Sequence, residues 1–523
     1  MPIASESSNA LTAEERWTLV AAIAASCMVF LDGTALNVAL PALQRDLNAN
    51  GAGMLWVVNS YLLVLAALVL EGGALGDRLG RKRVCMAGLM LFAAASLACG
   101  MAPATGWLIA ARLIQGVGGA LLVPGSLALI SAQFPANKRG QAIGTWSATT
   151  TLVLLAGPAL GGWLADAGWW RAIFLLNLPL AAVALVVLWR KVPETRDPSA
   201  EGSDWPGAAL AALGLAALTA GLLLVPAQGW ANPWVWGGVG GGFLALSAFI
   251  ALEAHASHPM LPLVLFRNRT FSGTNLLTLF LYGALTAATF FLSLNLVQVQ
   301  GYTQLQAGLA FMPLAGLISL GSRPAGRWAD RHGPRLLLTV GPLVVALGFG
   351  WLSTVGVTPG PSAYWNTFFP GMVLFGLGMA VTVVPLTTAV MTAVASHYAG
   401  TASGVNNAVS RAAGVLALAI FGAVALVDFH NQLALHTASV VLSAVARTDL
   451  RTEARKFGAA SVPVSVPARQ RPVVKQAFRE AFQHTFQRIL RLCSVMALAS
   501  AGLAFWLVPS VSPPTAKPPA NGK

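Results

Sequence analysis

Long apolar runs separated by short polar turns make up most of this chain. A helix that crosses a bilayer needs roughly 20 mainly apolar residues, and fourteen runs reach about that length. The runs are continuously apolar and do not alternate, which favours helices over the strands of a membrane barrel. We therefore predict an all-α, multi-pass membrane protein with fourteen spans at 17–40, 54–74, 84–102, 107–132, 141–165, 170–190, 207–228, 234–253, 271–298, 307–325, 336–354, 366–390, 404–427 and 490–508.

Two copies of one short motif indicate that the chain is built from related halves. Residues 73–83 read G-A-L-G-D-R-L-G-R-K-R, and residues 326–335 read G-R-W-A-D-R-H-G-P-R. The residues that match between the copies are Gly73, Asp77, Arg78 and Gly80 in the first and Gly326, Asp330, Arg331 and Gly333 in the second. Each copy follows the second span of a six-span set, and the offset is 330 − 77 = 253 residues.

This repeat predicts the organisation of the chain. Residues 1–190 and 259–510 form two six-helix halves, and residues 191–258 form a polar connector followed by two additional spans. Residues 428–489 form a long external loop, and residues 511–523 form a Pro-rich, disordered tail. Within that loop, Val474, Phe478, Phe482, Phe486 and Ile489 recur at helical spacing, which predicts an amphipathic helix. We favour a structural helix lying on the membrane surface over a partner-binding site.

Basic residues gather in alternate loops, and this bias predicts the orientation. Fourteen Lys and Arg residues lie in short loops on one side of the predicted membrane, against only Arg45 and Arg171 on the other. Because cytoplasmic loops carry the excess of basic residues, we expect both termini and both motif loops to lie on the cytoplasmic side of the cell membrane. The same bias accounts for the net charge of +14 without a nucleic-acid partner.

Composition and motif absences narrow the function further. Charged residues make up 10% of the chain, against about 25% in soluble proteins. The sequence contains no phosphate-binding G-x-x-x-x-G-K-[ST] motif, no metal-ligand spacing and no set of nucleophile and base within the spans. The four cysteines have no ligand spacing and are interpreted as small core residues. We therefore predict neither an enzyme nor a protein that needs a cofactor or metal.

Ionisable residues inside predicted spans are the strongest candidates for function. Asp32 in the first span and Arg112 in the fourth lie at similar depth, and buried charges in membranes mark ion or substrate pathways. A static ion pair that only fixes packing is the alternative. Glu71 is either a second protonatable site or, as we favour, an acid that faces the adjacent basic loop. Arg411 is interpreted as an anchor at the membrane interface.

Two further groups of residues complete the candidate set. Gly157, Pro158, Gly161 and Gly162 in the fifth span predict a kinked, closely packed face that can act as a hinge and seal between the halves. Polar and aromatic residues inside spans can line a substrate cavity, although each alone favours a helix–helix hydrogen bond. This set comprises Asn37, Asn59, Tyr61, Gln115, Trp146, Asn275, Asn295, Asn406 and Asn407.

At these residues the chain resembles the major facilitator superfamily, specifically its fourteen-helix drug:proton antiporters. The similarity lies in the 73–83 loop, in L-D-G-T-A-L-N-V-A-L-P of the first span, in R-L-I-Q-G-V-G-G-A of the fourth and in G-P-A-L-G-G of the fifth. One departure is Val153, which stands where the fifth-span motif usually has glycine.

The resemblance implies alternating access driven by inward proton flow. It implies that Asp32 takes the proton and that Arg112 tunes the proton affinity of Asp32. It also implies a conformational latch at the motif loops, comprising Gly73, Asp77, Arg78, Gly80, Arg81, Asp330 and Arg331. The expected substrates are amphipathic or cationic small molecules. A dedicated exporter of one metabolite or antibiotic, or a non-transporting membrane sensor, remains an alternative.

Overall fold

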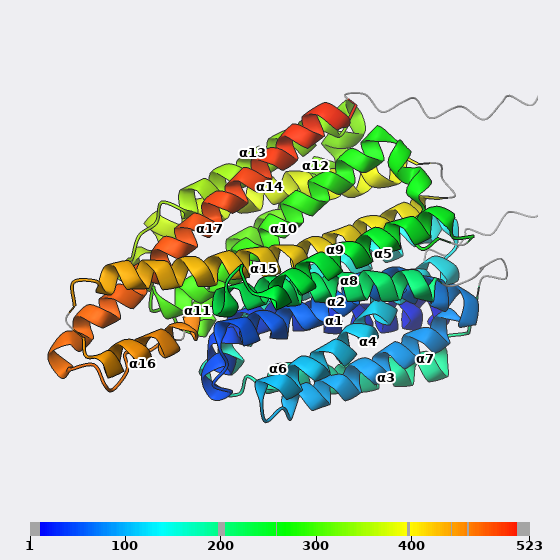
Figure 1. The fold of residues 1–523 in the computed structure, drawn as a ribbon. Helices are drawn as coiled ribbons and strands as arrows, with labels where there is room; N and C mark the ends of the chain where they lie inside the picture. The colour runs from blue at the N-terminus through cyan, green and yellow to red at the C-terminus, as the bar shows by residue number, and fades with distance from the viewer. Residues whose placement is uncertain are drawn as a thin grey trace, which may run out of the picture.

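The computed structural model describes residues 11–196, 204–257, 259–394, 398–440, 442–457 and 460–509. The predicted tail at 511–523 lies outside these residues. Within them the chain forms helices and no strand (Figure 1). The α-helices are α1 Ala13–Asp46, α2 Gly51–Leu79, α3 Arg81–Gly100, α4 Thr105–Gln133, α5 Ala136–Asp166, α6 Ala172–Leu175, α7 Asn177–Lys191, α8 Trp205–Gln228, α9 Pro233–His255, α10 Arg269–Gln298, α11 Gln304–Ala310, α12 Met312–His332, α13 Arg335–Leu352, α14 Tyr364–Thr392, α15 Ala399–Thr437, α16 Ala444–Ala454 and α17 Arg471–Leu507.

Thirteen helical segments in the described part of the chain are long and apolar enough to cross a membrane. They coincide with thirteen of the fourteen predicted spans. The remaining prediction, 141–165, lies within α5, a helix of 31 residues in which several side chains fall outside the described set. This helix packs along α1 and α11 inside the bundle, so its place in the architecture matches the prediction.

Local sequence signals account for where the helices begin and end. Thr12 caps α1 in a reciprocal arrangement with Glu15, and Asn50 caps α2 by accepting from the Gly53 N–H. The last glycine of each motif copy ends a helix in a left-handed conformation, with φ of 114° at Gly80 and 83° at Gly333. Because glycine adopts such values without strain, both copies of the motif make the same sharp turn.

The predicted external loop at 428–489 is largely helical, which corrects the sequence interpretation. Helix α15 continues through Thr437, α16 follows, and α17 begins at Arg471 and runs without a break into the last span. The predicted amphipathic helix is therefore the first part of α17. Its apolar stripe is buried within the protein core, with Phe482 2% and Phe486 0% exposed, and does not lie on a membrane surface. Its aromatic side chains find partners in Phe429 and Phe457, which sequence spacing alone did not reveal.

The two halves join along α15 and at one end of the bundle. Helix α15 packs against α2 of the first half and α10 of the second, and α8 of the additional pair packs against α2 and α15, with α9 against α8. We call the end that carries the motif loops the loop end and the opposite end the far end. Helix α1 begins and α17 ends at the loop end, whereas α16 lies at the far end (Figure 1).

Hydrogen bonds close the far end. The amide of Gln44 donates to the Lys456 carbonyl at 2.6 Å. The carboxylate of Asp166 in α5 accepts from the backbone N–H groups of Gln304 and Leu305, each at 2.8 Å, and so caps the start of α11 across the two halves. The chain is therefore held with its halves together at the far end.

Candidate functional site

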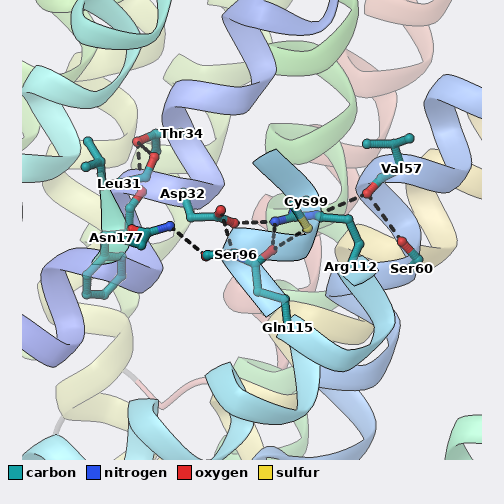
Figure 2. Close-up of polar contacts among 11 residues, drawn as sticks. Leu31, Asp32, Thr34, Val57, Ser60, Ser96, Cys99, Arg112, Gln115 and Asn177 are labelled. Atoms are coloured by element: carbon teal, nitrogen blue, oxygen red, sulfur yellow. Dashed lines mark hydrogen bonds and ion pairs between the residues drawn. The ribbon is translucent and has the colours of Figure 1, made fainter. Parts of the chain in front are cut away.

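A buried ion pair joins the first and fourth spans. Asp32 of α1 is 0% exposed and Arg112 of α4 is 1% exposed. Nη1 of Arg112 donates to Oδ2 of Asp32, and Figure 2 shows the two groups facing each other. Removing one partner of such a pair costs about 3–5 kcal/mol because it leaves an uncompensated buried charge.

Uncharged side chains complete the coordination of this pair. Gln115, one turn along α4 from Arg112, accepts from Nη1 of Arg112 at 2.8 Å and donates to Oδ1 of Asp32 at 2.9 Å. The same amide donates to Ser96 of α3 at 2.8 Å, and Asn177 of α7 donates to Ser96 at 3.0 Å (Figure 2). The network therefore crosses four helices of the first half and satisfies both charges inside it.

Backbone and aromatic groups hold the arginine from the other side. Nε of Arg112 donates to the Val57 carbonyl of α2 at 3.3 Å. The guanidinium lies over the ring of Tyr61 at 4.2 Å and 5.9 Å from the ring of Phe174, in cation–π contact. In this conformation Asp32 is closed off from solvent, so any proton exchange requires a rearrangement around it.

The predicted cavity residues fall into separate groups. Gln115 and Tyr61 belong to the network of Asp32 and Arg112. Asn406 of α15 donates to Asn275 and Thr278 of α10, Asn295 donates to Gln483 of α17, and Trp146 donates to Ser26 of α1. Asn59 is fully buried, the Asn37 carbonyl accepts from Ser293, and Asn407 is exposed. Most of the set therefore serves helix–helix contacts, and the structure does not bring it together around one cavity.

The glycines of the fifth span lie at two helix crossings. A Cβ atom on Gly161 would come within 2.3 Å of the Ala35 carbonyl oxygen in α1, and one on Gly162 within 2.2 Å of the Gln304 carbonyl oxygen. A Cβ atom on Gly308 of α11 would likewise come within 2.2 Å of the Pro158 carbonyl oxygen. Gly162 and Gly308 therefore allow α5 of the first half to touch α11 of the second, which is where a seal between the halves is predicted.

The first motif loop is tied to the connector that follows α7. Asp77 accepts from Nε of Arg81 at 2.8 Å, one turn along the chain. The Glu194 carboxylate accepts from the backbone N–H groups of Lys82 and Arg83, which caps the start of α3. In the second copy Arg331 is exposed, and the side chain of Asp330 lies outside the described residues. The latch function therefore remains a prediction.

Two further charged residues lie on helices that join parts of the bundle. Glu71 is 2% exposed and accepts from the Asp204 backbone N–H at the start of α8, so it joins α2 to the additional helices. Arg411 lies on α15, which packs against α2 and α10, and its side chain is partly exposed. Sequence reasoning also missed Ser96 and Asn177, which are single polar residues in apolar helices with no motif around them.

Solved structures share this arrangement of helices. A bacterial homologue of the human lysosomal transporter Spinster, in an inward-facing and unoccupied conformation, superposes with a TM-score of 0.66 at 16% identity, covering 96% of this chain and 100% of the other. A D-xylose–proton symporter superposes with a TM-score of 0.58 at 15% identity, covering 94% and 97%. At these identities the likeness concerns the fold alone.

Curated relatives are closer in sequence. The tetracenomycin C resistance and export protein of Streptomyces glaucescens is 32% identical over 77% of this chain and 75% of its own. The multidrug resistance protein Stp of Mycobacterium tuberculosis is 34% identical over 78% and 75%. The cephamycin export protein CmcT of Amycolatopsis lactamdurans is 36% identical over 80% and 85%.

Two packed halves, two additional helices and an ionic network buried in the first half define a multi-pass membrane transporter. The family model of the Major Facilitator Superfamily matches residues 22–418, and the chain belongs to that superfamily. The resemblance seen in the motifs is thereby confirmed. Proteins of this family are generally transporters of small molecules and not enzymes.

Proposed function

We propose that this protein exports amphipathic or cationic small molecules from the cytoplasm across the cell membrane, driven by inward flow of protons. The observation that carries the proposal is the buried pair of Asp32 and Arg112, an ionisable group placed inside the membrane at a site where charge is costly. The names of the curated relatives, which are export and resistance proteins, support the direction of transport.

The proposed cycle alternates the access of a site between the halves. The halves are joined at the far end, which we assign to the exterior, so this conformation corresponds to a carrier closed to the outside. Opening the far end would separate α5 from α11 and change the surroundings of α1. Asp32 would then gain solvent, bind a proton from outside and release it inside after the return. Asp77 and Arg78, with Asp330 and Arg331, would hold the loop end in the other conformation.

The names of the curated relatives suggest two alternatives for the range of substrates. Stp is named as a multidrug resistance protein, whereas CmcT is named for the export of one antibiotic class. A dedicated exporter of a single antibiotic is therefore the second candidate for this chain. A panel of structurally unrelated compounds separates the two, because a multidrug carrier responds to several and a dedicated exporter to one.

Everted membrane vesicles test both candidates. With the vesicle interior acidified, an exported compound that exchanges for protons should partly collapse the pH gradient when it is added. Vesicles without the protein provide the control. If compounds accumulate in the vesicles but the pH gradient has no effect on their rate of entry, the protein transports without proton coupling and the proposal is wrong.

A further inference from the structure

A second guanidinium lies on a helix at the boundary between the two halves. Arg411 follows the first residue of α15 by 12 positions, within a helix long and apolar enough to cross a membrane. Helix α15 belongs to the second half and packs against α2 of the first half and α10 of its own, so Arg411 lies where the halves meet.

No acid among the described residues neutralises Arg411. It makes no hydrogen bond or ion pair with any residue that the structure describes, and the phenol groups near it, Tyr61 and Tyr282, are uncharged at neutral pH. The buried carboxylate of Asp32 is engaged by Arg112. Charged residues within membrane spans mark substrate and ion pathways, and Arg411 has no described counter-charge, so an anionic ligand can complete the site during function.

The surroundings of Arg411 suit a ligand that also has an apolar body. The ring of Tyr61 covers Arg112 on one side, and its hydroxyl is buried without a hydrogen-bond partner in the described structure. Tyr282 of α10 supplies a second phenol from the other half. Tyr61 is buried in this conformation, whereas Tyr282 is partly exposed and offers apolar contact area near the guanidinium.

A polar face of α15 connects Arg411 with the loop end. Ser403, Asn407 and Arg411 recur every four residues and therefore lie on one side of the helix. Asn407 is exposed, and its amide donates to the Ser403 carbonyl at 3.1 Å, while Arg411 itself is partly exposed. Since the halves are joined at the far end, a solute that enters from the loop end meets this face first.

We propose that Arg411 binds the carboxylate of an amphipathic substrate between the two halves, an inference that rests on the proposed export function and narrows its substrate class. The planar guanidinium fork matches a carboxylate with two parallel N–H···O bonds, which add geometric specificity as well as binding energy. Substrates with a carboxylate, with or without a cationic group, are preferred over their esters.

A matched pair of dyes tests this preference directly. Rhodamine B carries a free carboxylate, and its ethyl ester has the same ring system without that charge. Binding of each dye to the purified full-length protein is measured by fluorescence anisotropy. The wild-type protein should bind rhodamine B about tenfold more tightly than the ester, since one charge-assisted contact is of that order. Arg411→Gln should remove this difference and change the affinity for the ester less than threefold.

Two further variants separate binding from folding. Arg411→Lys keeps the charge without the planar fork, and it should retain part of the preference for the carboxylate. Arg45→Gln makes the same chemical change at an exposed position at the far end of α1 and should leave both affinities unchanged.

The outcomes distinguish this inference from the proposed function. Equal affinity of the wild-type protein for the two dyes, or a preference that survives Arg411→Gln, overturns the inference even if pH-driven export is observed. A carboxylate preference that depends on Arg411, in a protein that shows no pH-driven export, supports the inference and overturns the proposed function.

Discussion

At the scale of single residues, the ionic pair of the first half depends on neighbours that carry no charge. Gln115 bridges the carboxylate and the guanidinium, and Tyr61 covers the guanidinium with its ring. Asp32 and Arg112 stand out in the sequence because charges are rare inside apolar runs. Gln115 and Tyr61 were recognised only as polar residues within spans, and Ser96 was not recognised, because one hydroxyl in an apolar helix carries no pattern.

The contact between Tyr61 and Arg112 predicts different effects for two substitutions. Tyr61→Phe keeps the ring over the guanidinium and removes a hydroxyl without a described hydrogen-bond partner, so it should change stability by less than about 1 kcal/mol. Tyr61→Ala removes the ring and leaves a cavity beside a buried charge, which should cost about 3–5 kcal/mol. Thermal unfolding of the purified protein measures both. A Phe variant as unstable as the Ala variant would show that the hydroxyl, and not the ring, supports the site.

At the scale of helices, close contact between α5 and α11 closes the far end. The fifth-span motif predicted small residues and a proline on one face, and the structure places Gly162 and Pro158 against the start of α11. The sequence did not indicate which helix they would meet, because the other side of the contact is backbone. For the same reason the capping of α11 by Asp166 had no sequence signature across 138 residues.

A methyl group at Gly162 should therefore hold the far end open. In Gly162→Ala the new Cβ would lie 2.2 Å from the Gln304 carbonyl oxygen, which is too close, so the backbones of α5 and α11 must move apart. Gln298 of α10, which donates to Gln44 across the closed end, is a suitable reporter as Gln298→Cys. Its reaction with a membrane-impermeant maleimide should be several-fold faster in the presence of Gly162→Ala. The control is Gly106→Ala, where nothing lies within 4 Å of an added Cβ, and equal rates in the two backgrounds would contradict this account.

At the scale of the whole molecule, the repeat predicted the two halves, and the extent of helix followed from the apolar runs. The segment 428–489 differs most from the sequence interpretation. It was predicted as a long loop with one amphipathic helix before the last span, whereas α15 and α17 extend through much of it and α16 lies between them. Aromatic side chains from separate segments hold these extensions together and become neighbours only in the folded chain. They are Phe429, Phe457 and Phe482.

The orientation predicted from the basic loops can be tested with two cysteine reporters. Arg83→Cys lies at the loop end on a side chain that is 80% exposed, and Val464→Cys lies at the far end at a position that is 87% exposed. The four native cysteines are buried and contribute little background. An impermeant maleimide added to intact cells should label Val464→Cys and spare Arg83→Cys. Labelling of both positions, or of Arg83→Cys alone, would refute a cytoplasmic loop end.

The central claim is that Asp32 carries the coupling proton, and one variant tests it most directly. Asp32→Asn keeps the shape and an acceptor for Arg112, which also retains its bonds to Gln115 and the Val57 carbonyl. Asp46→Asn, at an exposed ion pair with Arg171, provides the matched control.

Both variants are reconstituted into proteoliposomes, and substrate movement is measured with and without a pH gradient. We predict that Asp32→Asn still exchanges substrate across the membrane without a gradient, and that its rate of gradient-driven transport falls at least tenfold. Asp46→Asn should behave like the wild-type protein. Transport by Asp32→Asn that still accelerates with the pH gradient as in the wild-type protein would contradict the claim and leave the pair of Asp32 and Arg112 a structural element.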